Sequence, residues 1–277
     1  MRLGGPLFSK PADPGSWAAA CRAKGYRAAG CPLSPAAADA DCAAYAAAAA
    51  AADLVIAEVG AWSNPLSADA AERAAALEKC KGGLALAERV GARCCVNISG
   101  SRGRRWDGPH AANLTAETFD LVVASVREII DAVRPRRTFY ALETMPWMYP
   151  DSAESYERLL GAVDRPAFAV HFDPVNLVCS PQIYARTGEL IRDFVRRLGA
   201  QIRSCHAKDV LLRETLTAHL DEVRPGAGGL DYRAYLSALA ALDPDTPLIL
   251  EHLPNEAEYD LAAAHVRGVA GKEGIRL

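Results

Sequence analysis

The chain has 277 residues, of which 51% are hydrophobic and 23% are charged, a composition that allows a large buried core and excludes a disordered chain. The formal net charge of −3 and the isoelectric point near 6.1 exclude a general electrostatic attraction to nucleic acid or to an anionic membrane. A length of about 250 residues is typical of one large α/β barrel, although two small domains would also fit.

Short apolar runs alternate with longer helical patterns eight times along the chain. The runs are rich in β-branched residues, which favour strands, and the segments between them have high helix propensity. Predicted strands cover residues 2–8, 26–32, 53–58, 92–98, 137–143, 167–173, 202–206 and 247–251. Predicted helices cover residues 13–24, 35–52, 67–90, a segment beginning near 115, 152–163, 182–198, 231–241 and 256–269, with a long loop between 206 and 231.

This alternation predicts an α/β fold with a parallel sheet. Nearly continuous apolar strands are typical of a sheet that helices cover. Eight strand–helix units without an evident linker favour a closed (β/α)8 TIM barrel as a single domain over residues 1–277. An open dinucleotide-binding sheet is less favoured, because the first strand is not followed by G-x-G-x-x-G.

The N-terminal residues and the cysteines indicate the cellular compartment in which the protein is expected. The sequence MRLGGPLFSK lacks the apolar region of a secretory signal, and no segment has the length and apolarity of a membrane span. Eight cysteines occur without a C-x-x-C spacing. We therefore expect a cytoplasmic protein in which the cysteines are reduced, small core residues.

Four consecutive strand segments, from the fifth to the eighth, end in a side chain that can bind a metal ion. These side chains are Glu143, Asp173, His206 and Glu251, each about one strand–helix unit after the last. In a parallel barrel the carboxyl ends of neighbouring strands meet at one mouth, so we expect the four side chains to converge.

A single polar residue at a strand end is most simply explained by ordinary structural hydrogen bonding. Four in succession favour a shared role, because three converging carboxylates repel one another unless a cation lies among them. Three carboxylates and one imidazole, without a thiolate, are typical ligands of Mn²⁺, Mg²⁺ or Co²⁺ rather than of structural Zn²⁺. The sequence therefore predicts one divalent metal site.

The segments ALE, HFDPVN, CHAKD, RPGAGGLDY and LILEH resemble the sugar phosphate isomerase/epimerase family of xylose isomerase-like TIM barrels. That group includes D-tagatose 3-epimerase and is related to endonuclease IV. The resemblance implies that Glu143, Asp173, His206 and Glu251 hold one divalent ion, with Mn²⁺ expected first and Mg²⁺, Co²⁺ or Zn²⁺ as alternatives. It also implies that Glu143 and Glu251 act as acid and base on opposite faces of a ketose.

The expected activity is metal-dependent isomerisation or epimerisation of a keto-sugar through a metal-stabilised enediolate. The nearest alternative is a lyase or dehydratase of the same barrel group that acts on a keto-sugar, keto-glycoside or keto-polyol. An endonuclease IV-like nuclease is disfavoured by the acidic net charge and by Asn176, which stands where that group has a histidine three residues after the aspartate. A barrel that only binds sugar is disfavoured by the presence of both glutamates.

Further residues are expected near the mouth of the barrel. His171, two residues before Asp173, is expected to orient that carboxylate rather than to bind metal. Trp62, Trp106 and Trp147 follow the third, fourth and fifth strands, where aromatic rings suit a sugar, although tryptophans are as often packing residues. For His110, capping of a loop is an equally good interpretation. Asp209 is expected to be a structural turn residue. The expected substrate-binding residues are Glu58, Trp106, His110, Trp147, Asn176, Lys208 and Arg213.

The expected partner is a small carbohydrate, with neither nucleic acid nor a membrane as a partner. Barrels that resemble this chain often pair through helices on their outer face, which implies a homodimer or a homotetramer.

Overall fold

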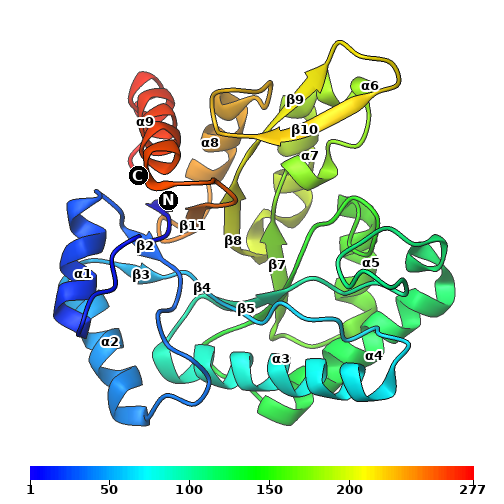
Figure 1. Ribbon diagram of the computed structural model, residues 1–277, viewed down its shortest axis with the longest axis horizontal. Helices are drawn as coiled ribbons and strands as arrows, with labels where there is room; N and C mark the ends of the chain where they lie inside the picture. The colour runs from blue at the N-terminus through cyan, green and yellow to red at the C-terminus, as the bar shows by residue number, and fades with distance from the viewer.

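The computed structural model describes residues 1–277 as a ring of parallel strands surrounded by helices (Figure 1). The strands follow one another around the ring in the order β3-β2-β1-β11-β8-β7-β6-β5-β4, and every neighbouring pair is parallel. Only Ala57 separates β3 from β4, so the two ends of this order are halves of one strand and the ring is nearly closed. The predicted TIM barrel is confirmed. The strands are β1 (Arg2–Gly4), β2 (Ala28–Ala29), β3 (Val55–Ile56), β4 (Glu58–Gly60), β5 (Cys94–Asn97), β6 (Tyr140–Glu143), β7 (Phe168–Phe172), β8 (Ile202–Ala207) and β11 (Pro247–Leu250).

Helices lie outside the ring, and their ends carry the capping residues that helices require. The side chains of Asp13, Asp69, Ser152 and Asn255 each accept a backbone N–H in the first turn of a helix. Gly91 ends the third helix at a φ of 74°, which glycine adopts without strain. The helices are α1 (Pro14–Ala23), α2 (Asp39–Ala51), α3 (Ala70–Val90), α4 (Ala116–Val133), α5 (Ala153–Val163), α6 (Pro181–Tyr184), α7 (Thr187–Leu198), α8 (Tyr232–Ala240) and α9 (Glu256–Lys272), with short 3₁₀ turns at Ala111–Leu114, Val175–Leu177 and Gly199–Gln201.

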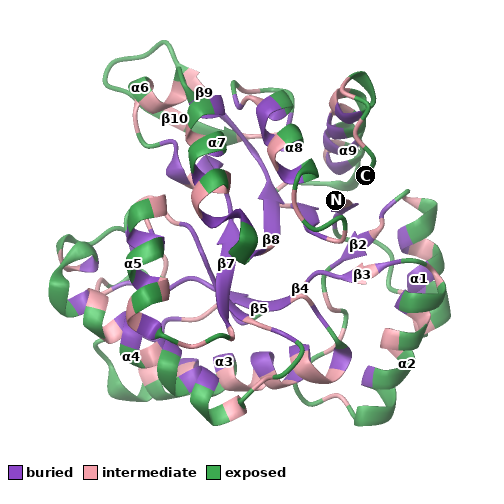
Figure 2. Ribbon diagram, turned by 180° about the vertical axis from the view of Figure 1, so that it is seen from behind, coloured by how far each residue is buried: buried purple, intermediate pink, exposed green.

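The core lies between the strands and the inner faces of the helices (Figure 2). Aromatic side chains fill it beside β7 and β8: the rings of Phe172 and Phe194 stack with their centroids 4.1 Å apart. The buried hydroxyl of Tyr156 donates to the carbonyl of Leu142 at 2.6 Å and lies 2.8 Å from that of Ala169, so α5 holds β6 and β7 together. Six of the eight cysteines are buried, and none forms a disulfide. None of the helices combines the length and apolarity needed to cross a membrane.

Several predicted elements differ in extent from the observed ones. The first strand ends at Gly4 rather than at residue 8, because Gly5 and Pro6 follow and proline cannot donate to a ladder. The predicted helix 182–198 is two helices, α6 and α7, and the predicted strand 53–58 is divided at Ala57 between two neighbours, β2 and β5.

The predicted long loop after β8 contains a β-hairpin. Its strands are β9 (Asp209–Arg213) and β10 (His219–Val223), which pair antiparallel with Asp209 opposite Val223. Figure 1 shows the hairpin, in yellow, as a projection beyond the ring of strands. The loop prediction failed there because the two segments are short and mix charged with apolar residues, so neither carries a strong strand pattern.

Candidate active site

The four side chains at the strand ends lie together. Glu143 is the last residue of β6, Asp173 follows β7, His206 is in β8 and Glu251 follows β11. One ligand-type atom from each lies within 4.8 Å of the others. The Nδ1 atom of His206 is 2.7 Å from a carboxylate oxygen of Glu251, 3.2 Å from one of Glu143 and 3.8 Å from one of Asp173. We call these four residues the strand-end cluster.

Local hydrogen bonds determine which oxygens face the cluster. Oδ1 of Asp173 accepts the backbone N–H of Val175 at 3.0 Å, so Oδ2 is directed inward. The hydroxyl of Thr144 donates to the carbonyl of Asp173 at 2.8 Å and accepts its N–H at 3.1 Å, which fixes the backbone after β7. The side-chain amide of Asn176 donates to Glu143 at 3.1 Å and therefore holds that carboxylate in place.

The ammonium group of Lys208 lies inside the strand-end cluster. Its Nζ is 2.6 Å from Oε1 of Glu251, 2.9 Å from Oδ2 of Asp173 and 3.7 Å from Oε1 of Glu143. Although these are close ion pairs, Oδ2 of Asp173 and Oε1 of Glu251 have no hydrogen bond of acceptable geometry. The contacts with Lys208 are therefore electrostatic rather than directed hydrogen bonds. Lys208 is buried, with 3% of its residue surface exposed.

Charge pairing outweighs burial throughout this region. Burial raises the pKa of Asp173, but the charges of Lys208 and His206 outweigh it and hold the pKa well below its usual value. In Glu251, burial opposes the nearby His206 and Lys208, which lower the pKa to about 2. Conversely, burial lowers the pKa of His206 and of Lys208, and the surrounding carboxylates raise both well above their ordinary values. The carboxylates of Asp173 and Glu251 are thus ionised at neutral pH.

The strand-end cluster fits a divalent metal ion. Two of its buried oxygens, Oδ2 of Asp173 and Oε1 of Glu251, are held only by ion pairs with Lys208 and His206 and by no directed hydrogen bond, so both are available to a divalent ion. The donor set of three carboxylates and one imidazole is typical of Mn²⁺, Mg²⁺ and related ions. These four residues are therefore the ones that would hold such an ion.

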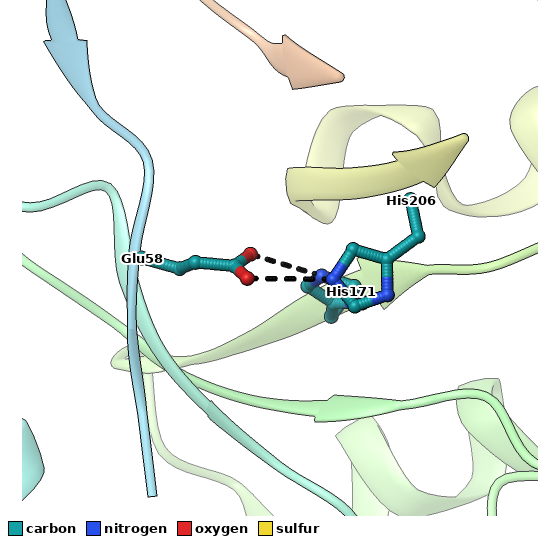
Figure 3. A group of neighbouring side chains, drawn as sticks. All are labelled: Glu58, His171 and His206. Carbon is teal, nitrogen blue, oxygen red and sulfur yellow. Dashed lines mark hydrogen bonds and ion pairs between the residues drawn. The ribbon is translucent and has the colours of Figure 1, made fainter. Parts of the chain in front are cut away.

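Glu58 lies on the opposite side of His206 from the carboxylates. Its Oε1 is 3.3 Å from Nε2 of His206, and its Oε2 is 3.2 Å from Nε2 of His171 (Figure 3). Oε2 also lies 2.8 Å from the hydroxyl of Ser204. Burial raises the pKa of Glu58, but the charge of His206 and the hydrogen bonds from both histidines lower it well below its usual value. Glu58, which was expected to bind substrate, thus contacts His206 on the side that faces away from the other three residues of the strand-end cluster. His171 contacts Glu58 rather than Asp173.

A cavity of about 370 Å³ opens above the strand-end cluster. Glu143, Glu251, Lys208 and Asn176 form part of its wall, and Trp62, Trp106 and Trp147 form much of the rest. The indole N–H of Trp147 donates to the carbonyl of Asp107 at 2.8 Å, which joins the loop after β6 to the loop after β5. The other lining residues are Ile98, Arg105, Asp107, Met145, Pro146, Glu222 and His252.

Besides Glu58, two further residues expected to bind substrate do not line this cavity. His110 caps the 3₁₀ turn at Ala111–Leu114, where its Nδ1 accepts the N–H of Ala112 at 3.2 Å. Arg213 pairs with Asp221 across the hairpin at 2.7 Å and is half exposed. The four expected substrate-binding residues that do line it are Trp106, Trp147, Asn176 and Lys208.

Sequence reasoning missed Glu222 and His252. Glu222 reaches the cavity from β10, where its carboxylate is 3.6 Å from Nζ of Lys208 and 3.1 Å from Nδ1 of His252. No signal in the sequence places a residue of that segment at the mouth, because the hairpin was not predicted. His252 directly follows Glu251, and this adjacency is the one signal that was available.

Comparison with known proteins gives one family and many structural neighbours. A family model described as a xylose isomerase-like TIM barrel matches residues 18–269. No curated protein matches the sequence. D-psicose 3-epimerase from Clostridium cellulolyticum H10 is 16% identical, with a TM-score of 0.70 over 98% of this chain and 99% of that one.

Two other solved structures are similar over nearly their full lengths. A probable 3-DHS dehydratase from Bacillus anthracis is 15% identical, with a TM-score of 0.69 over 97% of this chain and 98% of its own. Endonuclease IV from Thermus thermophilus is 15% identical, with a TM-score of 0.74 over 98% of this chain and 100% of its own. At such identities the similarity establishes the fold.

Proposed function

Because this chain belongs to the xylose isomerase-like TIM barrel family, we propose that it is a divalent-metal-dependent isomerase or epimerase of a small keto-sugar. The observation that carries the proposal is the convergence of Glu143, Asp173, His206 and Glu251 beneath a cavity walled by tryptophans. The similarity to a ketose 3-epimerase supports it. We propose Mn²⁺ as the ion, on the basis of the oxygen-rich donor set.

The two glutamates supply the acid–base chemistry in this proposal. A bound divalent ion would polarise the ketone of the substrate and stabilise the negative charge that develops on its oxygen. Glu143 ends β6 and Glu251 follows β11, so the two come from strands on either side of the strand that carries His206, and both line the cavity. One carboxylate removes the proton beside the ketone, and the other returns a proton to the opposite face, which inverts the carbon. Return to the neighbouring carbon gives isomerisation instead.

The remaining wall residues orient the substrate. The rings of Trp106 and Trp147 present apolar surfaces that suit the C–H faces of a sugar. Lys208 and Asn176, which also line the cavity, supply N–H donors to substrate hydroxyl or ketone oxygens. The volume of about 370 Å³ is that of a site for a small ligand. Nucleic acid is not proposed as a substrate.

A panel experiment tests the proposal. The purified chain is stripped of metal, reconstituted with Mn²⁺, Mg²⁺ or Co²⁺, and incubated with ketoses in D₂O. We expect a metal-dependent product that carries deuterium at the carbon beside the ketone. Metal-dependent loss of water would establish the dehydratase alternative instead, and metal-dependent cleavage of abasic-site DNA would establish a nuclease. Turnover that is unchanged after metal removal contradicts all three.

Two further proposals accompany the activity. The eight cysteines, none in a disulfide, support a cytoplasmic location. A homodimer or homotetramer formed through the outer helices is proposed by analogy with related barrels, and sedimentation measurements on the purified chain test it.

A further inference from the structure

We infer that Glu58 is a positioning residue that directs Nδ1 of His206 toward the strand-end cluster by accepting a hydrogen bond from Nε2. The inference rests on the proposed metal centre. It assigns to a carboxylate from the first half of the chain the task of orienting a ligand from the second half.

The two nitrogens of His206 face different surroundings. Nδ1 faces Glu251, Glu143 and Asp173, whereas Nε2 faces Oε1 of Glu58 at 3.3 Å (Figure 3). An ionised carboxylate only accepts hydrogen bonds, so the nitrogen that faces Glu58 carries a proton. Nδ1 likewise faces a carboxylate oxygen, that of Glu251 at 2.7 Å. A bound metal ion would therefore replace the proton on Nδ1 while Nε2 keeps its hydrogen bond to Glu58, which is how the orientation of a metal-binding histidine is commonly fixed.

Glu58 is itself held by a second set of donors. Its Oε2 lies 2.8 Å from the hydroxyl of Ser204 and 3.2 Å from Nε2 of His171. An irregularity between β7 and β8 brings these two donors together: Val170 pairs with Ile202, but His171 pairs with Ser204, so Arg203 is an extra residue on β8. Bulges of this kind often redirect side chains beside functional sites.

The position of Glu58 in the barrel strengthens the assignment. Glu58 begins β4, which lies four places from β8 around the ring, so its side chain reaches His206 through the barrel interior. Only 11% of the Glu58 side chain is exposed, and neither Glu58 nor His171 lines the cavity. A buried carboxylate that does not line the cavity can affect the chemistry only through its neighbours, and His206 is the one of them that belongs to the strand-end cluster.

The same three side chains could instead bind a second metal ion, since two imidazoles and a carboxylate form a common ligand set. The observed hydrogen bonds favour the positioning role, because both oxygens of Glu58 already accept from His206, His171 and Ser204. Metal stoichiometry separates the two assignments. One Zn²⁺ per chain is expected from elemental analysis, and two, with the second lost in His171→Gln, would overturn the inference.

The decisive measurement is ¹⁵N NMR of histidine-labelled protein, metal-free and loaded with Zn²⁺. In the loaded protein we expect His206 to bind metal through Nδ1 and to keep a proton on Nε2. Zn²⁺ affinity, from competition with a chelator, should fall about 10- to 100-fold in Glu58→Ala and recover partly in Glu58→Gln, which retains an acceptor. Metal bound through Nε2, or wild-type affinity in Glu58→Ala, contradicts the inference.

Glu88→Ala is the matched control. Its carboxylate accepts the backbone N–H groups of residues 136, 137 and 138 and has no contact with the strand-end cluster. This variant should lose stability but keep wild-type Zn²⁺ affinity. If the wild-type chain binds no metal, the proposed function fails, and the metal-free spectra still decide the inference. A Nε2–H resonance of His206 that shifts in Glu58→Gln supports it, and one that does not shift overturns it.

Discussion

At the scale of single residues, Lys208 has an unusual environment. Its ammonium is buried against Asp173 and Glu251, two of the residues proposed to bind metal. It therefore compensates their negative charges in the metal-free protein. A metal ion entering the cluster would meet this positive charge, so Lys208 is expected to stabilise the metal-free protein and to weaken metal binding.

Replacement of Lys208 by Met should destabilise the metal-free protein by about 3–5 kcal/mol, because removal of one partner leaves buried carboxylates uncompensated. Excess Mn²⁺ should restore most of this loss. Chemical denaturation with and without metal measures both effects. Lys81→Met is the control: Lys81 pairs with Glu78 and Glu128 on the surface, and its loss should cost at most about 1 kcal/mol whether or not metal is present.

The two glutamates allow a test of acid–base catalysis that is separate from metal binding. Glu143→Gln and Glu251→Gln keep a ligand oxygen but lose the ionisable carboxylate. Each should lower kcat by about 10²- to 10⁴-fold when Mn²⁺ is saturating. Rates under saturating metal provide the measurement, with the exposed Glu154→Gln as the control. Near-wild-type rates in both variants would leave the glutamates with a structural role.

Trp106 and Trp147 are predicted to bind substrate, since both line the cavity and each has more than a third of its surface exposed. Trp106→Ala and Trp147→Ala should raise KM or lower kcat/KM by about tenfold, the loss of one stacking contact of about 1 kcal/mol. Metal content should remain that of the wild type. Unchanged kinetics in both variants would assign the two rings to packing.

At the scale of elements, Asp209 organises the segment that connects β8 to α8. Its buried carboxylate accepts four backbone N–H groups, those of Val210, Gly226, Gly228 and Leu230, at 2.8 to 3.1 Å. These bonds fold the loop after β10 back onto the start of β9. They thereby set the base of the hairpin that carries Glu222 to the cavity.

Asp209→Ala should lower the free energy of unfolding by about 3 kcal/mol or more, because it leaves several buried N–H groups without an acceptor. Amide hydrogen exchange should accelerate first in residues 224–230. The same measurements on Asp221→Ala provide the control, because Asp221 is exposed and pairs only with Arg213 on the hairpin surface. Uniform acceleration over the whole barrel would show that Asp209 does not act locally.

The elements also show what the sequence could predict. The convergence of Glu143, Asp173, His206 and Glu251 followed from their place at the ends of neighbouring parallel strands, a property of chain order and strand direction. The contact of Glu58 with His206 and that of Lys208 with Asp173 depend instead on the direction in which each side chain points across the barrel interior. The approach of Glu222 depends on a hairpin whose two short strands mix charged with apolar residues and so carry no strong strand pattern. No local pattern encodes these features.

At the scale of the whole molecule, metal binding is predicted to stabilise the barrel. An ion that binds only the folded protein adds about 2.7 kcal/mol when its concentration is 100 times its Kd. Addition of Mn²⁺ to chelator-treated protein should therefore raise Tm, with one ion bound per chain. In Asp173→Asn the increase should be much smaller. An equal increase in that variant would place the ion elsewhere.

The division of the barrel into two sequence halves has a consequence for recombination. All four proposed ligands come from residues 143–251, whereas Trp62, Trp106 and Glu58 come from the preceding half. A chimaera that takes its first half from another barrel would exchange part of the recognition surface and keep the ligands. We expect such a chimaera to bind metal at wild-type affinity only if the donor half supplies a carboxylate at the start of β4, which metal titration of paired chimaeras can measure.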